Sequence, residues 1–228
     1  MREQTLQECD RMGYNAIDVN RICLHGRMEA LPAFSHANHG VEFYRFPLAV
    51  RRLSGVEDRI HILASRPLLE QAGDLAPEQE LTVTGEVRTF NNRSGEGSRL
   101  IISVFARTIL PQEGEDGNRL DLTGTLCKQP TLRATPLGRT ICDFILAVNR
   151  RYGRSDYLPC IAWGSLAHRC GEKKVGDRIG LTGRLQSRLY QKRLDEQTLE
   201  RTAFEVSVMT LAGDEEVAPP YLAFMASL

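Results

Sequence analysis

Four aromatic residues are interleaved with basic residues in the C-terminal half of the chain: Tyr152, Tyr157, Trp163 and Tyr190. An exposed ring stacks on an unpaired nucleobase, and each stacked base contributes roughly 1–3 kcal/mol with little sequence preference. Neighbouring cations pair with the phosphates between the bases. The basic side chains that we expect to contact phosphates are Arg150, Arg151, Arg154, Arg184, Arg188, Lys173, Lys192 and Arg193. This combination of rings and cations predicts a surface for single-stranded nucleic acid.

The two halves of the chain differ in charge, although the net charge of the whole chain is zero. Residues 118–211 contain 16 Lys and Arg against 9 Asp and Glu, whereas residues 20–111 contain 11 against 10. Binding of a polyanion depends on local cationic density, because released counterions drive it. A solvated basic surface would show the same excess, so the charge agrees with nucleic-acid binding without requiring it.

The chain repeats itself at a constant offset of 98 positions. Asn20 aligns with Asn118, Phe46 with Phe144, and the pair Thr84-Gly85 with Thr182-Gly183. The alignment needs no gap from residue 20 to about residue 90, and beyond that point the second copy gains four residues. A fixed offset over this length indicates a duplicated domain.

Each copy has the pattern of five strands with a short helix between the third and the fourth. Apolar residues alternate with polar ones in the expected strands, and Gly183 predicts a bend within one of them. In the second copy the expected strands are Asn118–Leu126, Arg139–Asn149, Tyr157–Trp163, Arg178–Leu189 and Thr202–Leu211, with the helix near Ser165–Cys170. This order is typical of the OB fold, a five-stranded barrel. We therefore predict an all-β chain of two tandem OB-fold barrels.

Five segments follow from the repeat. They are an N-terminal extension (1–19), a first OB fold (20–110), a polar linker (111–117), a second OB fold (118–211) and a C-terminal tail (212–228). The extension has weak helical character, and the tail has the polar, proline-containing composition of a partly flexible segment.

The aligned positions of the first copy hold Ser54, Arg59, Ser65 and Asn92 instead of the four rings. Tyr and Trp also favour strands for packing reasons alone. However, rings that the fold itself required would be present in both copies. The contrast favours a ligand-binding role for the rings, with Tyr157 and Trp163 on the outer face of one strand while Leu158, Cys160 and Ala162 fill the barrel.

Several other classes of site find little support. The sequence contains no phosphate-binding glycine loop, nucleophile motif or metal-ligand cluster, so we expect neither an enzyme nor a cofactor, metal or small-molecule substrate. His36 and His39 lie in a stretch that we interpret as a turn. The cysteines are expected to be reduced and structural. No apolar run could span a membrane and residues 1–20 lack the pattern of a signal peptide, so we expect a cytoplasmic, nucleoid-associated protein.

A group of motifs in the second copy forms a recognisable pattern: residues 118–124, Gln129-Pro130, Gly138, Asp143–Arg150, Ile161–Gly164, Val175–Tyr190 and Glu205–Val208. With these motifs the chain resembles the bacterial single-stranded DNA-binding protein family in its two-OB-fold form. The resemblance implies that the four rings are DNA-stacking positions. It also implies a homodimer with four OB folds and roles in DNA replication, recombination and repair.

The chain departs from that family in two respects. The first copy lacks the ring set, so we expect it to serve mainly as the built-in partner of the second. The family commonly ends in an acidic tip closing with Pro-Phe, whereas this chain ends with Tyr221–Leu228, so we do not predict recruitment of repair enzymes. The alternative interpretation is a primosome-like OB-fold accessory module that acts mainly through protein contacts. Whether the chain prefers DNA or RNA stays open, because stacking tolerates either sugar.

Overall fold

The computed structural model of the chain describes residues 18–92, 100–151, 153–194 and 197–212, and for residues 189–194 and 197–201 it describes the backbone alone. The first half contains β1 (Asn20–Met28), β2 (Ala33–Asn38), β3 (Val41–Arg51), β4 (Glu57–Ser65), α2 (Arg66–Ala72), β5 (Glu80–Asn91) and β6 (Leu100–Pro111). The second half contains β7 (Gly117–Leu126), β8 (Thr131–Ala134), β9 (Thr140–Asn149), β10 (Ser155–Trp163), α3 (Ser165–Gly171), β11 (Arg178–Leu194) and β12 (Gln197–Leu211).

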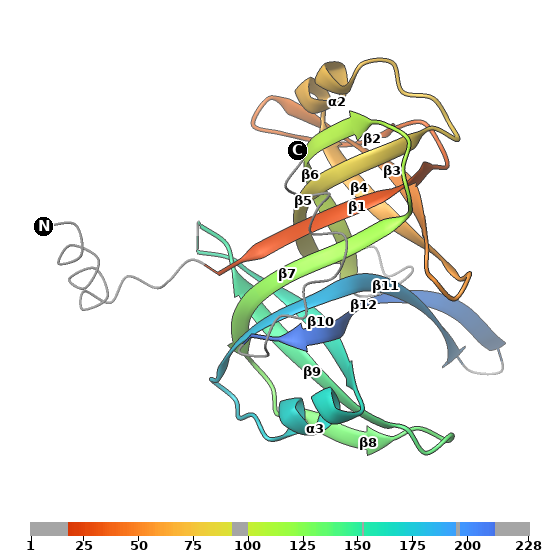
Figure 1. Cartoon of the computed structure of the whole chain (residues 1–228). Coiled ribbons are helices and arrows are strands. Elements are labelled where there is room, and N and C mark those ends of the chain that lie inside the picture. Colours follow the sequence, from red (N-terminus) through yellow and green to blue (C-terminus); the bar gives the residue numbers. More distant parts are fainter. Residues whose placement is uncertain (1–17, 93–99, 152, 195–196, 213–228) are drawn as a thin grey trace, which may run out of the picture.

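Each half closes into a barrel of five strands. In the first half β1 pairs with both β5 and β3, β3 pairs with β4, β4 runs parallel to β6, and β6 pairs with β5. The second half repeats this circuit with β7, β9, β10, β12 and β11. The short helices α2 and α3 follow β4 and β10 and lie at opposite ends of the molecule (Figure 1). The prediction of two OB-fold barrels is confirmed.

Alternating side chains fill each barrel. In β9, Phe144, Leu146 and Val148 are buried, whereas Asn149 at the strand end is exposed. A pleated strand sends successive side chains to opposite faces, so one apolar set lines the interior. Burial of these residues stabilises the second barrel. Strand β10 belongs to the same barrel and has one face on its outside.

A glycine bends the same strand in each barrel. The register between β11 and β12 shifts at Thr182/Gly183, and the register between β5 and β6 shifts at Thr84/Gly85. A Cβ atom at Gly183 would lie 2.5 Å from the carbonyl oxygen of Ser207, so only glycine fits this close approach. Such a bulge increases the local twist and lets a short sheet close on itself.

The two barrels are joined edge to edge. Strand β1 pairs antiparallel with β7, from Asn20 opposite Leu122 to His25 opposite Gly117, and the two strands cross the middle of the molecule side by side (Figure 1). This pairing makes one continuous sheet of 12 strands. A six-stranded segment of it, in the order β6-β5-β1-β7-β11-β12, spans both barrels.

One local expectation was wrong, and one further strand was not expected. The stretch with His36 was expected to be a turn, but residues 33–38 form β2, and the turn is confined to His39 and Gly40. Pairing with β3 explains the difference, because it supplies partners for the backbone groups of this polar segment. The second barrel has the matching strand β8, which was not expected either.

Strand β11 extends to Leu194 and β12 starts at Gln197, so their hairpin is longer than the alternation indicated.

The described cysteines are unpaired. Cys142, Cys160 and Cys170 are buried as free thiols, and Cys127 is exposed. Among the described residues, no group of three His, Cys, Asp or Glu side chains is placed to hold a metal ion. In the same part of the chain, no helix has the length and apolar character needed to cross a membrane.

Candidate single-stranded nucleic-acid interface

Strand β10 presents two large rings on its outer face. The side chain of Tyr157 is 52% exposed and that of Trp163 is 38% exposed. The alternate residues Leu158, Cys160 and Ala162 are buried in the barrel, as the sequence predicts. Six residues of extended strand separate the two rings by about 20 Å. The rings therefore form two separate platforms along one strand, each able to stack on a base.

The turn before β10 adds cations at one end of this face. Arg151 and Arg154 are exposed, and neither forms an ion pair with another described residue. The turn is closed by a hydrogen bond from the Arg150 amide to the Arg154 carbonyl oxygen at 2.6 Å, and Gly153 supplies a positive φ of 72°. Two unpaired guanidinium groups in a tight turn beside Tyr157 are suited to phosphates.

Arg150 also makes contacts that the sequence did not predict. Its guanidinium donates to the carboxylate of Asp156, with Nε to Oδ2 at 2.8 Å, and to the Thr89 carbonyl oxygen at 3.3 Å. Asp156 is fully buried, and its Oδ2 also accepts a hydrogen bond from Nη1 of Arg88 at 3.2 Å. These bonds hold the guanidinium of Arg150 at the contact between the barrels.

The remaining predicted residues are dispersed. Lys173 is exposed in the loop after α3, and Arg184 is half-buried in β11 with its Nε lacking a hydrogen-bond partner. Arg188 is exposed in β11 and lies 3.6 Å from Glu205. Tyr152 falls outside the described residues. Tyr190, Lys192 and Arg193 lie in β11, where the structure describes the backbone alone.

A pair of equivalent polar contacts fastens the barrels together. Asp156 of β10 accepts hydrogen bonds from the amide of Thr89 at 2.6 Å and from its hydroxyl at 3.2 Å. Asp58 of β4 accepts the same two bonds from Ser187 of β11, at 2.6 and 2.7 Å. Both residues of the second contact lie 98 positions from their counterparts in the first. The barrels are therefore related by an approximate two-fold axis, with one aspartate junction on each side of it.

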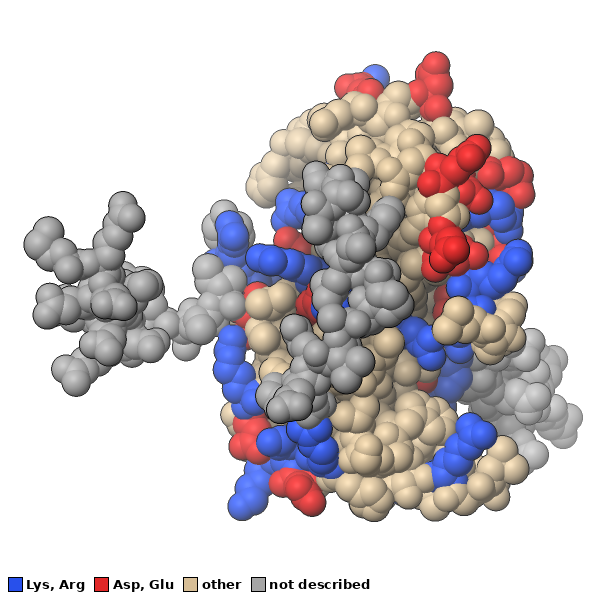
Figure 2. All heavy atoms as spheres, viewed as in Figure 1, with Lys and Arg blue, Asp and Glu red and all other residues tan. Residues whose placement is uncertain are grey.

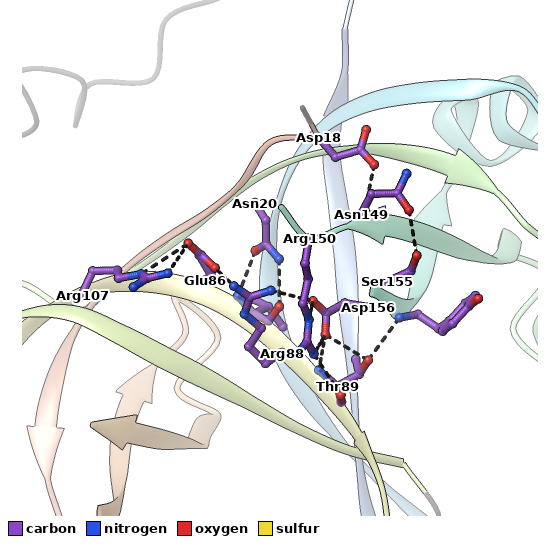
Figure 3. A network of polar contacts seen from close by, with 12 residues as sticks. Asp18, Asn20, Glu86, Arg88, Thr89, Arg107, Asn149, Arg150, Ser155 and Asp156 are labelled. Carbon is purple, nitrogen blue, oxygen red and sulfur yellow. Dashed lines mark hydrogen bonds and ion pairs between the residues drawn. The ribbon is translucent and has the colours of Figure 1, made fainter. Parts of the chain in front are cut away.

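Both junction aspartates are held in the charged form. Burial opposes the charge of Asp156, but hydrogen bonds from Arg150 and the Thr89 amide, with the charges of Arg150 and Arg88, outweigh burial and lower its pKa. Burial likewise opposes the charge of Asp58, and bonds from Arg52 and Ser187 lower the pKa of that carboxyl. Figure 3 shows Arg88 and Arg150 converging on Asp156 next to Thr89.

One exposed ring at this junction was missed by the sequence analysis. Phe90 follows Thr89 at the end of β5 and is 41% exposed. The guanidinium carbon of Arg150 lies 5.7 Å from the centre of its ring. The position aligned with Phe90 in the second copy is Arg188, so comparing the copies at this position would have revealed a ring present in one barrel only.

The two barrels differ in surface charge. On the face drawn in Figure 2, acidic side chains gather over the upper barrel, which is the first, and basic side chains predominate over the second. The face with Arg151 and Arg154 thus belongs to the more cationic half of a neutral chain.

Comparisons with known proteins agree with this geometry. The model of the single-strand binding protein family matches residues 117–212. The single-stranded DNA-binding protein of Clostridium tetani is 37% identical over 81 residues, covering 32% of this chain and 56% of the relative. Single-stranded DNA-binding protein A of Bacillus subtilis is 38% identical over 81 residues, covering 32% and 47%. The chain spans about half the length of the curated relatives it matches.

A solved structure covers both barrels. The wild-type single-stranded DNA binding protein from Thermus aquaticus is similar with a TM-score of 0.68 and 26% identity, covering 90% of this chain and 96% of that one. The likeness therefore extends over the paired arrangement and not only over the second barrel. The barrel formed by residues 117–212 is thus similar to the single-strand binding protein family, and the pair of barrels is similar to the Thermus aquaticus protein.

Proposed function

We propose that the chain is a non-enzymatic protein that binds single-stranded DNA with little sequence preference. Tyr157 and Trp163 stack on bases, and Arg151 and Arg154 contact phosphates. The observation that carries this proposal is the exposure of both rings on the outer face of β10 while the alternate residues Leu158, Cys160 and Ala162 fill the barrel. Exposing a large ring to water is unfavourable unless a ligand covers it. The names of the family and of the relatives support the same ligand.

A fluorescence titration tests this function directly. Trp163 is the chain's single tryptophan, so its emission reports on the proposed face. We expect oligo-dT to quench it, with an affinity that falls steeply as salt rises because phosphate contacts release counterions. Absence of quenching at low salt, together with no binding of labelled dT, would contradict the proposal. A parallel titration with rU decides between DNA and RNA.

The assembly that we propose is a homodimer with four OB folds. The first barrel occupies the place of a partner for the second, and the resulting six-stranded segment β6-β5-β1-β7-β11-β12 forms a broad sheet. A second copy packing on such a sheet would bring the four barrels together. Light scattering after size exclusion distinguishes a mass of about twice 25.6 kDa from that of the monomer.

A second candidate function is an accessory role through protein contacts, including contacts at the nucleoid during replication, recombination or repair. The supporting observation is a group of rings on the first barrel: Phe34 meets Tyr44 edge to face at 5.9 Å, and His36 stacks on Phe43 at 5.1 Å. The aligned positions of the second barrel are Leu132, Ala134, Ile141 and Cys142. Rings absent from one copy are not required by the fold. If Phe34→Ala left DNA affinity unaltered while disrupting a replication complex, this function would be favoured.

A further inference from the structure

We infer that Phe90 of the first barrel is an additional base-stacking residue, so that the strand-binding face crosses from the second barrel onto the first. This inference rests on the proposed function and extends it to a residue outside the ring set of the second copy. Its ligand is an unpaired nucleobase of the same DNA strand that passes over Tyr157.

The position of Phe90 follows from the junction. The backbone amide of Tyr157 donates a hydrogen bond to the hydroxyl of Thr89 at 3.2 Å. The end of β5 is thereby held against the start of β10. The Phe90 ring lies over the guanidinium of Arg150, which is bonded to Asp156, the residue directly before Tyr157 in β10.

The Phe90 ring contacts one cation and is partly exposed to solvent. The Arg150 guanidinium carbon lies 5.7 Å from the ring centre, and the bonds of Arg150 to Asp156 fix that guanidinium in place. A ring backed by a fixed cation is pre-organised, which lowers the entropic cost of binding a base. The 41% exposure of Phe90 leaves ring surface available to a ligand.

The other side of the two-fold axis serves as an internal comparison. There the junction of Asp58 and Ser187 has the same hydrogen bonds. The residue after Ser187 is Arg188, whereas the residue after Thr89 is Phe90. The junction therefore does not need a ring after its hydroxyl residue. Tyr157 is likewise matched by Arg59, so both rings lie on one side of the axis and both arginines on the other.

The charge of the ringed side suits DNA. Arg151 and Arg154 are exposed in the adjoining turn, without ion pairs among the described residues. Phosphates that flank bases on Tyr157 and Phe90 would find these cations nearby. An aromatic contact for a protein would not require this density of positive charge.

Binding measurements with labelled dT test the inference. Phe90→Leu keeps apolar bulk against Arg150 but removes the flat face of the ring. We expect this variant to bind dT roughly five- to 150-fold more weakly than the wild type. The slope of log affinity against log salt should stay the same, because no phosphate contact is lost. Phe90→Trp restores a ring and should restore the affinity. Phe34→Leu, which alters an exposed phenylalanine outside the junction, is the matched control and should change affinity less than twofold.

Photo-crosslinking provides a second readout that does not depend on stability. A dT oligomer containing 5-iododeoxyuridine should crosslink to the peptide that contains Phe90 in the wild-type protein. The inference alone would be overturned if the wild-type protein bound dT, the affinities of Phe90→Leu and Phe34→Leu were the same, and no crosslink formed at Phe90. Failure of the wild-type protein to bind dT would instead overturn the proposed function.

Discussion

The carboxylate of Asp156 in the second barrel is bonded to both the amide and the hydroxyl of Thr89 in the first, at 2.6 and 3.2 Å. This contact places the end of β5 against the start of β10. It also keeps Arg150 and Arg88 neutralised inside the junction. The geometry of the proposed binding face therefore depends on a buried ion pair between the barrels.

Asp156→Asn is expected to destabilise the protein. The change leaves Arg150 without its buried counter-charge and leaves Arg88 with Glu86 alone, and breaking a buried pair costs about 3–5 kcal/mol. Denaturant unfolding measures the loss. Asp143→Asn is the control, since Asp143 and its partner Arg133 are both exposed and a surface pair contributes about 0–1 kcal/mol. Similar losses in the two variants would contradict a structural role for the junction.

Stability should fall in mild acid. The pKa values of Asp58 and Asp156 are lowered in the folded protein, so their contribution is present above the unfolded value of about 4 and is lost as the pH falls through the folded values. Melting temperatures between pH 7 and pH 3 should therefore drop mostly below pH 4. The double variant Asp58→Asn, Asp156→Asn should start lower at pH 7 and show a smaller drop. A double variant as acid-sensitive as the wild type would assign the effect to other carboxyls.

The rings of β10 should dominate binding. Tyr157→Ala and Trp163→Ala are each expected to weaken dT binding by roughly 1–3 kcal/mol, because each removes one stacking surface. Anisotropy of a labelled oligomer is the measurement, since one variant lacks the tryptophan. Arg59→Ala, at the position aligned with Tyr157, should have a smaller effect. Equal losses at positions 59 and 157 would be incompatible with a DNA face centred on β10.

The exposed arginines should be visible in the salt dependence. Arg151→Ala and Arg154→Ala are each expected to reduce the slope of log affinity against log salt by about 0.7, the value for one phosphate contact on a single strand. Arg66→Ala, an exposed arginine of α2 paired with Glu42 and Glu70, should leave the slope as in wild type. Unaltered slopes in all three variants would remove the β9–β10 turn from the binding face.

The architecture was predictable because it depends on local alternation and on a repeat. Strand β10 illustrates this: alternation alone separated Leu158, Cys160 and Ala162 from Tyr157 and Trp163, and their burial agrees. Gly183 likewise marked the bend of the second barrel, and Gly85 lies at the equivalent bend of the first. The alternation follows from the pleat of a strand, and the glycines follow from close approach of two backbones. Both patterns can be seen in the sequence itself.

The junction was not predictable for a physical reason. Arg150 is adjacent to Arg151 and looks equally available in the sequence. Only the folded arrangement brings Asp156 and Thr89 to it, and Thr89 is 61 residues away. Phe90 was missed for the same reason, because its contact with Arg150 of the other barrel is formed only in the folded protein. Residues whose role is set by contacts between domains carry no periodic signal.

The antiparallel pairing of β1 with β7 has an evolutionary consequence. In an assembly of two identical subunits, every substitution appears on both sides of the symmetry axis. Here the two sides belong to one polypeptide, so each can mutate independently while the pairing keeps their stoichiometry fixed at any dilution. That freedom allows one flank to carry Phe90 and Tyr157 while the opposite flank carries Arg188 and Arg59 at the equivalent positions.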